Sequence, residues 1–260
     1  MKKETKRLIV AGLAIGIISA GLVLLGNPKN MGFCIACFIR DIAGATKLHS
    51  AGVVQYVRPE IIGLVLGAFA VSLVTKEFKP RGGSSPFIRF CIGFMVMIGA
   101  LTFLGCPFRM VLRLAGGGLN AVVALVGFIC GIATACFFIN KGFDLGKYSY
   151  QSTLEGVALP TVNVILLIIL VAVPSLLAFS ESGPGSMHAP ILASLLAGVI
   201  VAVIAQRTRL CMIGGIRDII LVQDFSLLLG FIAIFVSALI VTLITGNFKL
   251  RFPGQPVAHT

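Results

Sequence analysis

Long apolar runs separated by short polar stretches limit how this chain can fold more than any other feature. Seven runs are expected to form helices: Leu8–Leu25, Pro59–Thr75, Phe87–Leu104, Leu119–Ile139, Leu159–Phe179, Pro190–Gln206 and Leu227–Thr245. Each approaches the roughly 20 apolar residues that a helix needs to cross a bilayer. The mean hydropathy is +1.06 and only 12% of residues are charged. The sequence therefore predicts an all-α, polytopic integral membrane protein.

The basic charge balance indicates membrane orientation rather than nucleic-acid binding. The formal net charge is +12, but the cations stand singly at the ends of apolar runs instead of forming a basic block. A Lys/Arg cluster, MKKETKR, precedes the first run. Because cytoplasmic flanks are enriched in Lys and Arg, we expect a cytoplasmic N-terminus, a lipid bilayer as partner and no nucleic acid.

A short motif occurs twice, once in each half of the chain. The first copy, GFCIACFIRDI, runs from Gly32 to Ile42, and the weaker copy, RLCMIGGIRDI, from Arg209 to Ile219. The copies share a thiol, a cation and a carboxylate: Cys34 aligns with Cys211, Arg40 with Arg217 and Asp41 with Asp218, while Cys37 falls on Gly214. Ionisable groups at membrane depth usually line a pathway or pair with each other. The simpler alternative is an interfacial Arg/Asp pair that ties a helix end.

Short helices that do not cross the membrane are predicted near three cysteines. Met31–Ala45, around Cys34, is too short and too polar for a span but suits a re-entrant or broken helix. Cys106 lies in GCPFRMVLRLAGGG, where the flanking glycine and proline should end the preceding helix before a short new helix begins. Arg109 and Arg113 are four residues apart and would share one face of that helix.

The remaining cysteines and the glycines are expected to serve packing. Cys91, Cys130 and Cys136 lie within apolar runs and are predicted to be small buried apolar residues, not parts of a disulfide framework. GLAIG, GLVLG and GFICG, which begin at Gly12, Gly63 and Gly127, have the spacing that lets membrane helices approach closely.

The two motif copies are expected to have opposite orientations in the membrane. Counted from a cytoplasmic N-terminus, the first copy follows an outward run and the second an inward run. Inverted repeats with discontinuous helices near the midplane are typical of transporters. We expect residues 1–140 to form one repeat unit, 141–189 a cytoplasmic loop and connecting span, and 190–260 a second unit.

With GNPKN and GFCIACFIRD, LGCPFRMVLRLAGGGLNA, GPGSMHAP and QRTRLCMIGGIRD, the chain resembles the YeeE/YedE family of membrane proteins. It is most similar to the YedE-type selenium transporters, over nearly all 260 residues. The resemblance implies an hourglass-shaped, inverted-repeat helical bundle in a bacterial inner membrane or an archaeal cell membrane. Family members continue into a further hairpin with a second GCP-type motif, so the second repeat is expected to be incomplete here.

The resemblance also implies which residues line a substrate pathway. Cys106 matches the GCP cysteine of the family, and Cys34 and Cys211 match the cysteines of its paired short helices. We assign Cys37 and Arg109 to the same pathway. The implied substrate is a small sulfur- or selenium-containing compound such as thiosulfate or a selenium analogue. A cytoplasmic protein that carries sulfur or selenium is a further expected partner.

The chemistry of such an anion favours transport over catalysis. Thiols offer its soft sulfur weak, exchangeable contacts, and the N-termini of short helices favour its oxyanion end. Strong arginine clamps would hold a dianion too tightly to release it. We therefore expect Arg40–Asp41 and Arg217–Asp218 to be structural charge pairs.

Other functions stay open at this point. Cys34 and Cys37 form a CxxC pair of the kind used by membrane thiol oxidoreductases, and a persulfide on a cysteine would serve sulfur transfer. A subunit that transports nothing is a further alternative. The three histidines lie in predicted loops, and the sequence has no nucleotide-binding GxxxxGK[ST] motif. We therefore expect no metal site, no cofactor and no enzymatic activity.

Overall fold

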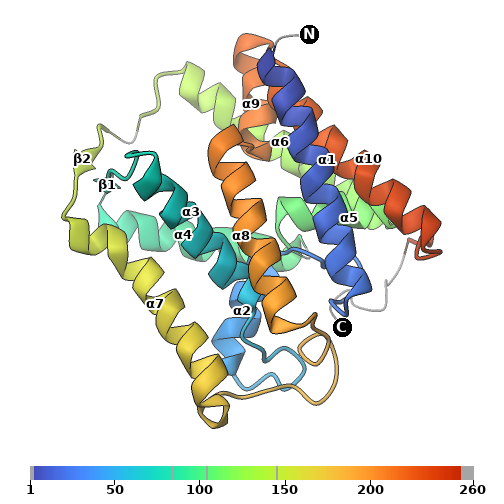
Figure 1. Ribbon diagram of the computed structural model, residues 1–260. Helices are drawn as coiled ribbons and strands as arrows, with labels where there is room; N and C mark the ends of the chain where they lie inside the picture. Colours follow the sequence, from blue (N-terminus) through green and yellow to red (C-terminus); the bar gives the residue numbers. More distant parts are fainter. Residues whose placement is uncertain (1–2, 84, 104, 145, 253–260) are drawn as a thin grey trace. The chain divides into compact units, whose positions relative to one another are not determined.

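The computed structural model describes residues 3–83, 85–103, 105–144 and 146–252, and its regular structure there is almost entirely helical (Figure 1). The helices are α1 (Lys3–Leu24), α2 (Ile35–Ala45), α3 (Pro59–Val74), α4 (Pro86–Thr102), α5 (Pro107–Ala115), α6 (Asn120–Asn140), α7 (Thr153–Ala172), the 3-10 turn η1 (Pro174–Leu176), α8 (Ile191–Thr208), α9 (Met212–Val222) and α10 (Ser226–Ile244). Two short strands, β1 (Arg81–Gly82) and β2 (Ser149–Tyr150), pair with each other.

Six stretches of the described chain are long and apolar enough to cross a membrane. They are Lys3–Leu24, Pro86–Ala115, Asn120–Asn140, Thr153–Ala172, Ile191–Val222 and Ser226–Ile244. The second stretch contains α4 and α5, and the fifth contains α8 and α9. The predicted predominantly helical chain, with several helices long and apolar enough to span a membrane, is therefore confirmed.

The seventh predicted span forms a shorter helix. α3 begins at Pro59, whose fixed φ suits the first helical position, and has 16 residues. It is capped at Thr75, and Lys76 follows with a φ of +56°. At 1.5 Å per residue the helix is about 24 Å long, against a hydrocarbon core of roughly 30 Å.

The contacts divide the chain into two compact units. The first unit comprises Met1–Cys34, Leu104–Phe143 and Arg207–Thr260, and the second comprises Ile35–Phe103 and Asp144–Gln206. Each unit thus combines segments from both halves of the sequence.

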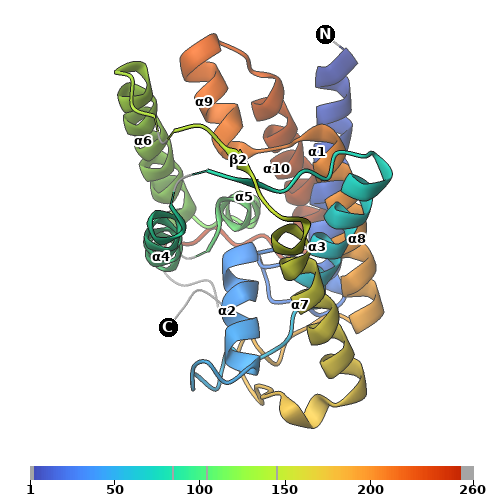
Figure 2. The ribbon, with the colours of Figure 1, turned by 90° about the vertical axis from the view of Figure 1, so that its left-hand side faces the viewer.

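In the first unit, α1 and α10 lie side by side and run in the same direction (Figures 1 and 2). Gly12 makes the close approach possible, because a Cβ there would clash with the carbonyl oxygen of Gly230. One turn later, a Cβ on Gly16 would clash with the hydroxyl of Ser237. Small residues thus let two backbones meet where larger side chains would separate them, as in other membrane helix pairs.

The second unit contains a matching helix pair, α3 and α8. A Cβ on Gly63 would clash with the carbonyl oxygen of Leu195, and a Cβ on Gly198 would clash with the carbonyl oxygen of Glu60. The hydroxyl of Ser194 also donates to the Glu60 carboxylate at 2.9 Å. The residue numbers of the contacting positions increase together along the two helices, so α3 and α8 also run in the same direction.

Among the described residues of the long helices α4, α6 and α7, few are buried. α7 packs on α3, and their apolar cluster includes Val57, Ile62 and Leu170. Among the described residues of α4, none is buried. Gly127 and Gly131 of α6 have open space where a Cβ would stand, so the predicted close packing at GFICG is not present in the described structure. Such exposed apolar faces are those that a membrane helix presents to lipid.

Candidate functional site

Each of the three cysteines predicted to line the pathway lies directly before a short helix. Cys34 precedes α2, Cys106 is the N-cap of α5, and Cys211 is the N-cap of α9. The first turn of a helix leaves backbone N–H groups without helical partners, and its dipole favours negative charge. At α9, the N–H of Gly214 donates to the Cys211 sulfur at 3.4 Å. A soft sulfur centre and an anion-favouring helix end therefore coincide in the sequence three times.

Cys34, Cys106 and Arg109 gather around Gly105 in the first unit. Gly105 has a φ of +132°, which glycine adopts far more readily than other residues, and Pro107 begins α5 two positions later. A Cβ on Gly105 would lie 2.6 Å from Cδ of Arg109 and 3.3 Å from Sγ of Cys34. The lack of a side chain at this break lets the Cys34 thiol and the Arg109 stem approach the residue before Cys106.

This cluster is shielded from solvent. Cys34, Cys106 and Arg109 are 0%, 8% and 1% exposed. The neighbouring rings of Phe33 and Phe108 pack edge to face with centroids 6.4 Å apart. Burying an arginine side chain is costly, and ionisable groups at membrane depth are usually functional. We therefore take these three residues as the candidate site.

The other predicted pathway residues lie in different surroundings. Cys211 belongs to the first unit but is exposed, whereas Cys37 is buried on α2 in the second unit. All seven cysteines lie in the described ranges, and none of them forms a disulfide there. Cys136 is buried as predicted, but the prediction was wrong for Cys91 and Cys130, which are exposed on apolar helices. An apolar run does not by itself distinguish a core-facing cysteine from a lipid-facing one.

The first predicted charge pair is extended by a residue that the sequence reasoning missed. Arg40 contacts Asp41 at 2.7 Å, and Arg58 contacts the other oxygen of Asp41 at 2.8 Å. Both Asp41 and Arg58 are completely buried. Arg58 also donates to the carbonyls of Pro184 and Met187 at 2.7 and 3.0 Å. The guanidinium thus ties α2, the start of α3 and the loop before α8 together.

The second charge pair has no comparable burial. Arg217 contacts Asp218 at 2.8 Å, with Arg217 exposed and Asp218 half-buried. The two motif copies therefore share the local Arg/Asp contact but not its surroundings.

Tyr56 lies against the buried Arg58. Its ring stacks on His188 with centroids 4.2 Å apart and also lies 5.2 Å from the Arg58 guanidinium. The tyrosine hydroxyl has no hydrogen-bond partner among the residues that the structure describes. Burial raises the pKa of Tyr56 to about 12; the charge of Glu60 also raises it, and that of Arg58 lowers it.

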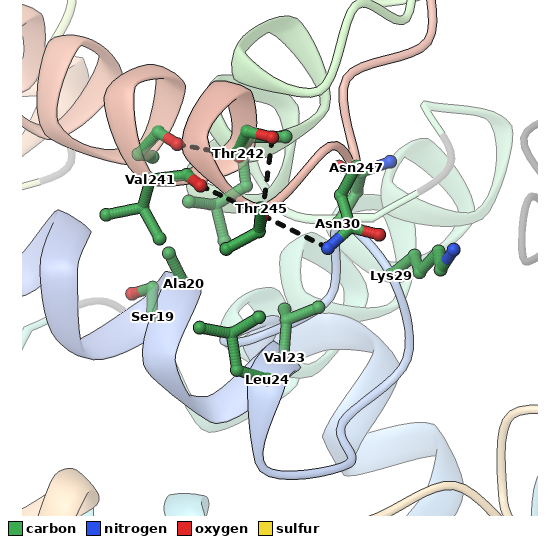
Figure 3. Close-up of a pocket in the computed structure, with 12 residues that line it drawn as sticks. Ser19, Ala20, Val23, Leu24, Lys29, Asn30, Val241, Thr242, Thr245 and Asn247 are labelled. Atoms are coloured by element: carbon green, nitrogen blue, oxygen red, sulfur yellow. Dashed lines mark hydrogen bonds between the residues drawn. The ribbon is translucent and has the colours of Figure 1, made fainter.

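A small pocket lies between the last turns of α1 and α10 in the first unit (Figure 3). Thr242 and Thr245 of α10 line it opposite Ser19 of α1. The Thr245 hydroxyl donates to the carbonyl of Val241 at 2.9 Å and accepts from Asn247 at 3.2 Å. At about 30 Å³ the pocket holds one or two waters, so it is too small to be the substrate site.

No group of three or more His, Cys, Asp or Glu side chains within the described ranges has the arrangement of a metal site. No family model matches the chain, and no curated protein sequence matches it either. The described chain is predominantly helical and has six stretches long and apolar enough to cross a membrane, as a multi-pass membrane protein has, and the cysteine–arginine cluster is its candidate site.

Proposed function

We propose that this chain is a membrane transporter that takes up a small sulfur- or selenium-containing anion, such as thiosulfate or a selenium analogue. The observation that supports this most directly is the buried cluster of Cys34, Cys106 and Arg109 around Gly105. The resemblance to the YeeE/YedE family supports the same substrate class. In this proposal the protein lies in a cell inner membrane with its N-terminus in the cytoplasm.

The cluster matches both ends of such an anion. The thiols of Cys34 and Cys106 give a soft terminal sulfur weak contacts that it exchanges easily. The Arg109 guanidinium offsets part of the charge of the oxyanion end, and the start of α5 adds its backbone N–H groups. Arg109 alone offsets only part of the charge of a dianion, so its contact stays weak enough for the anion to depart.

The helix pairs support an inverted repeat. If the first motif copy corresponds to the second, then α1, α2 and α3 correspond to α8, α9 and α10. The α1–α10 pair would then correspond to the α8–α3 pair. Both pairs are parallel and meet at glycine, Gly12 with Gly230 and Gly198 with the turn that contains Gly63. Such reciprocal packing is what a two-fold relation between repeats requires.

The same contacts support a seventh crossing by α3. Parallel helices cross the membrane in the same direction, so the number of crossings from α1 to α10 inclusive must be odd. The six long stretches alone give an even number. Counting α3 as a crossing gives the required odd number. It also makes α3 cross in the same direction as α8, as their parallel packing requires. In this proposal α2, α5 and α9 are the short re-entrant helices.

Uptake into proteoliposomes tests the function. We expect saturable uptake of labelled thiosulfate or a selenium analogue, little uptake of sulfate, which lacks a soft sulfur, and no covalent adduct on any cysteine by mass spectrometry. Absence of uptake for the whole panel would contradict the proposal. Labelled sulfur on Cys34 or Cys106 would instead favour sulfur transfer, and a Cys34–Cys37 disulfide formed during turnover would favour the oxidoreductase alternative.

A further inference from the structure

A two-stranded ribbon in the second unit presents an exposed arginine stacked on two tyrosines. β1 and β2 pair antiparallel, with Arg81 opposite Tyr150 and Gly82 opposite Ser149 (Figure 1). The Arg81 guanidinium lies 4.7 Å from the ring centroid of Tyr148 and 5.9 Å from that of Tyr150. Both rings are more than half exposed, at 56% and 66%. Stacking on the rings restricts the guanidinium while the side chain stays exposed.

The ribbon lies next to the ends of three apolar helices. β1 connects α3 to α4, and β2 leads directly into α7. The residues at these helix ends, Val74, Phe87 and Leu154, are large, apolar and highly exposed. Such helix ends are where the hydrocarbon core of a bilayer is expected to begin, so we expect the ribbon at the depth of the lipid headgroups. Tyrosine is enriched at that depth, where its ring and hydroxyl meet different surroundings.

The charges near the ribbon are mainly positive and exposed. Five cations, Lys76, Lys79, Arg81, Arg89 and Lys147, stand with three carboxylates, Glu77, Asp144 and Glu155. Asp144 accepts from the Gly146 N–H at 2.7 Å, and Glu155 accepts from the Ser152 hydroxyl at 3.5 Å. The Arg81 guanidinium makes no hydrogen bond or ion pair with any residue that the structure describes.

We propose that this surface binds the phosphate headgroups of anionic phospholipids. We call it the ribbon surface and define it by Lys79, Arg81, Arg89, Lys147, Tyr148 and Tyr150. The planar guanidinium presents paired N–H groups that match phosphate oxygens, and juxtamembrane cations attract anionic lipids. The exposed apolar helix ends favour a lipid over free phosphate, because they offer contacts to acyl chains. This inference does not depend on the transport function.

A single tryptophan reporter makes the proposal testable. The chain contains no tryptophan, so Tyr150→Trp introduces one while keeping an aromatic ring beside Arg81. The protein with this reporter is reconstituted in vesicles, and tryptophan quenching by brominated phosphatidylglycerol is compared with quenching by brominated phosphatidylcholine. We expect preferential quenching by the anionic lipid, weakened by high salt. Equal quenching by both lipids would overturn the proposal.

Charge variants in the same background test which side chains bind. Arg81→Gln should weaken the apparent affinity for phosphatidylglycerol roughly fivefold, and Arg81→Lys should weaken it less. Lys47→Gln is the matched control, since Lys47 is an exposed cation in the loop before α3, at the opposite end of that helix from the ribbon. Excess inorganic phosphate should not displace the lipid. Full displacement by phosphate, or an equal loss of affinity with Lys47→Gln, would contradict a lipid site on this surface.

Discussion

At the scale of single residues, the buried pair of Arg58 and Asp41 is the strongest polar constraint in the second unit. Both side chains are fully buried, and Arg58 is also held between the rings of Phe38 and Tyr56, 4.8 and 5.2 Å from their centroids. A buried ion pair of this kind often contributes little net stability, but removal of one partner leaves an uncompensated charge. The pair therefore fixes the loops around α3 more than it stabilises the fold.

Arg58→Ala should lower the free energy of unfolding by about 3 kcal/mol, because Asp41 keeps only Arg40 as a partner and the carbonyls of Pro184 and Met187 lose their buried donor. Arg217→Ala is the matched control, since its contact with Asp218 is exposed, and it should cost less than about 1 kcal/mol. Denaturant unfolding in detergent measures both. Equal small losses would show that the Arg58 guanidinium is not buried as described.

Tyr56→Phe should leave stability at neutral pH unchanged or slightly raised, because the hydroxyl has no partner among the described residues. The native pKa of Tyr56 is raised from 10.0 to about 12, so the unfolded chain ionises first as pH rises. Native stability should therefore fall between pH 10 and 12 in the parent protein, and less steeply in Tyr56→Phe. Melting temperatures of the two proteins across this range make the comparison; identical slopes would contradict it.

The sequence predicted some of the site residues and not others for physical reasons. Cys106 was recognisable because a glycine and a proline flank it, a pair that favours a helix break followed by a new helix starting at the proline. Arg58 was missed because its acceptors lie far along the chain: Asp41 is 17 positions away, and the carbonyls of Pro184 and Met187 are 126 and 129 positions away. No local pattern encodes such contacts.

At the scale of elements, glycine at the crossing points lets paired helices approach closely. The spacing in GLAIG and GLVLG predicted close packing, and α1 and α3 do pack closely through it. GFICG has the same spacing in α6 without a close neighbour at Gly127 or Gly131 in the described structure. Spacing shows that a helix is able to approach a partner, while the partner is determined by the rest of the fold.

Gly198→Val should destabilise the protein by about 1–3 kcal/mol, because the new side chain would displace the backbone of α3 at Glu60. Gly99→Val in α4 is the matched control, since nothing lies within 4 Å of a Cβ there. It should have little effect on the melting temperature in detergent. A comparable loss in both variants would point to helix propensity instead of packing.

At the scale of the whole molecule, the parallel α1–α10 pair constrains the membrane topology. The described residues contain six stretches long and apolar enough to cross, and the proposed seventh crossing is the 16-residue α3. Hydropathy predicted that α3 spans the membrane, but it does not explain why a helix of this length should cross. The parallel α1–α10 pair does, because it requires an odd number of crossings.

A tag at the N-terminus and a tag inserted at Gly246, in the turn after α10, should therefore lie on opposite sides of the membrane. Accessibility to an impermeant label in sealed cells measures this, with lysed cells as the control. Labelling of both tags on the same side would mean an even number of crossings.

The central claim is that buried cysteines form the transport pathway, and uptake of labelled thiosulfate by cysteine variants in proteoliposomes tests it most directly. Cys34→Ala and Cys106→Ala remove the thiols of the cluster around Gly105, whereas Cys130→Ala removes an exposed thiol on α6. The account predicts that each cluster variant loses at least roughly tenfold in uptake, which corresponds to about 1.4 kcal/mol, while its melting temperature is unchanged. Cys130→Ala should keep the parent rate of uptake. Full uptake by the double variant Cys34→Ala/Cys106→Ala would contradict the account.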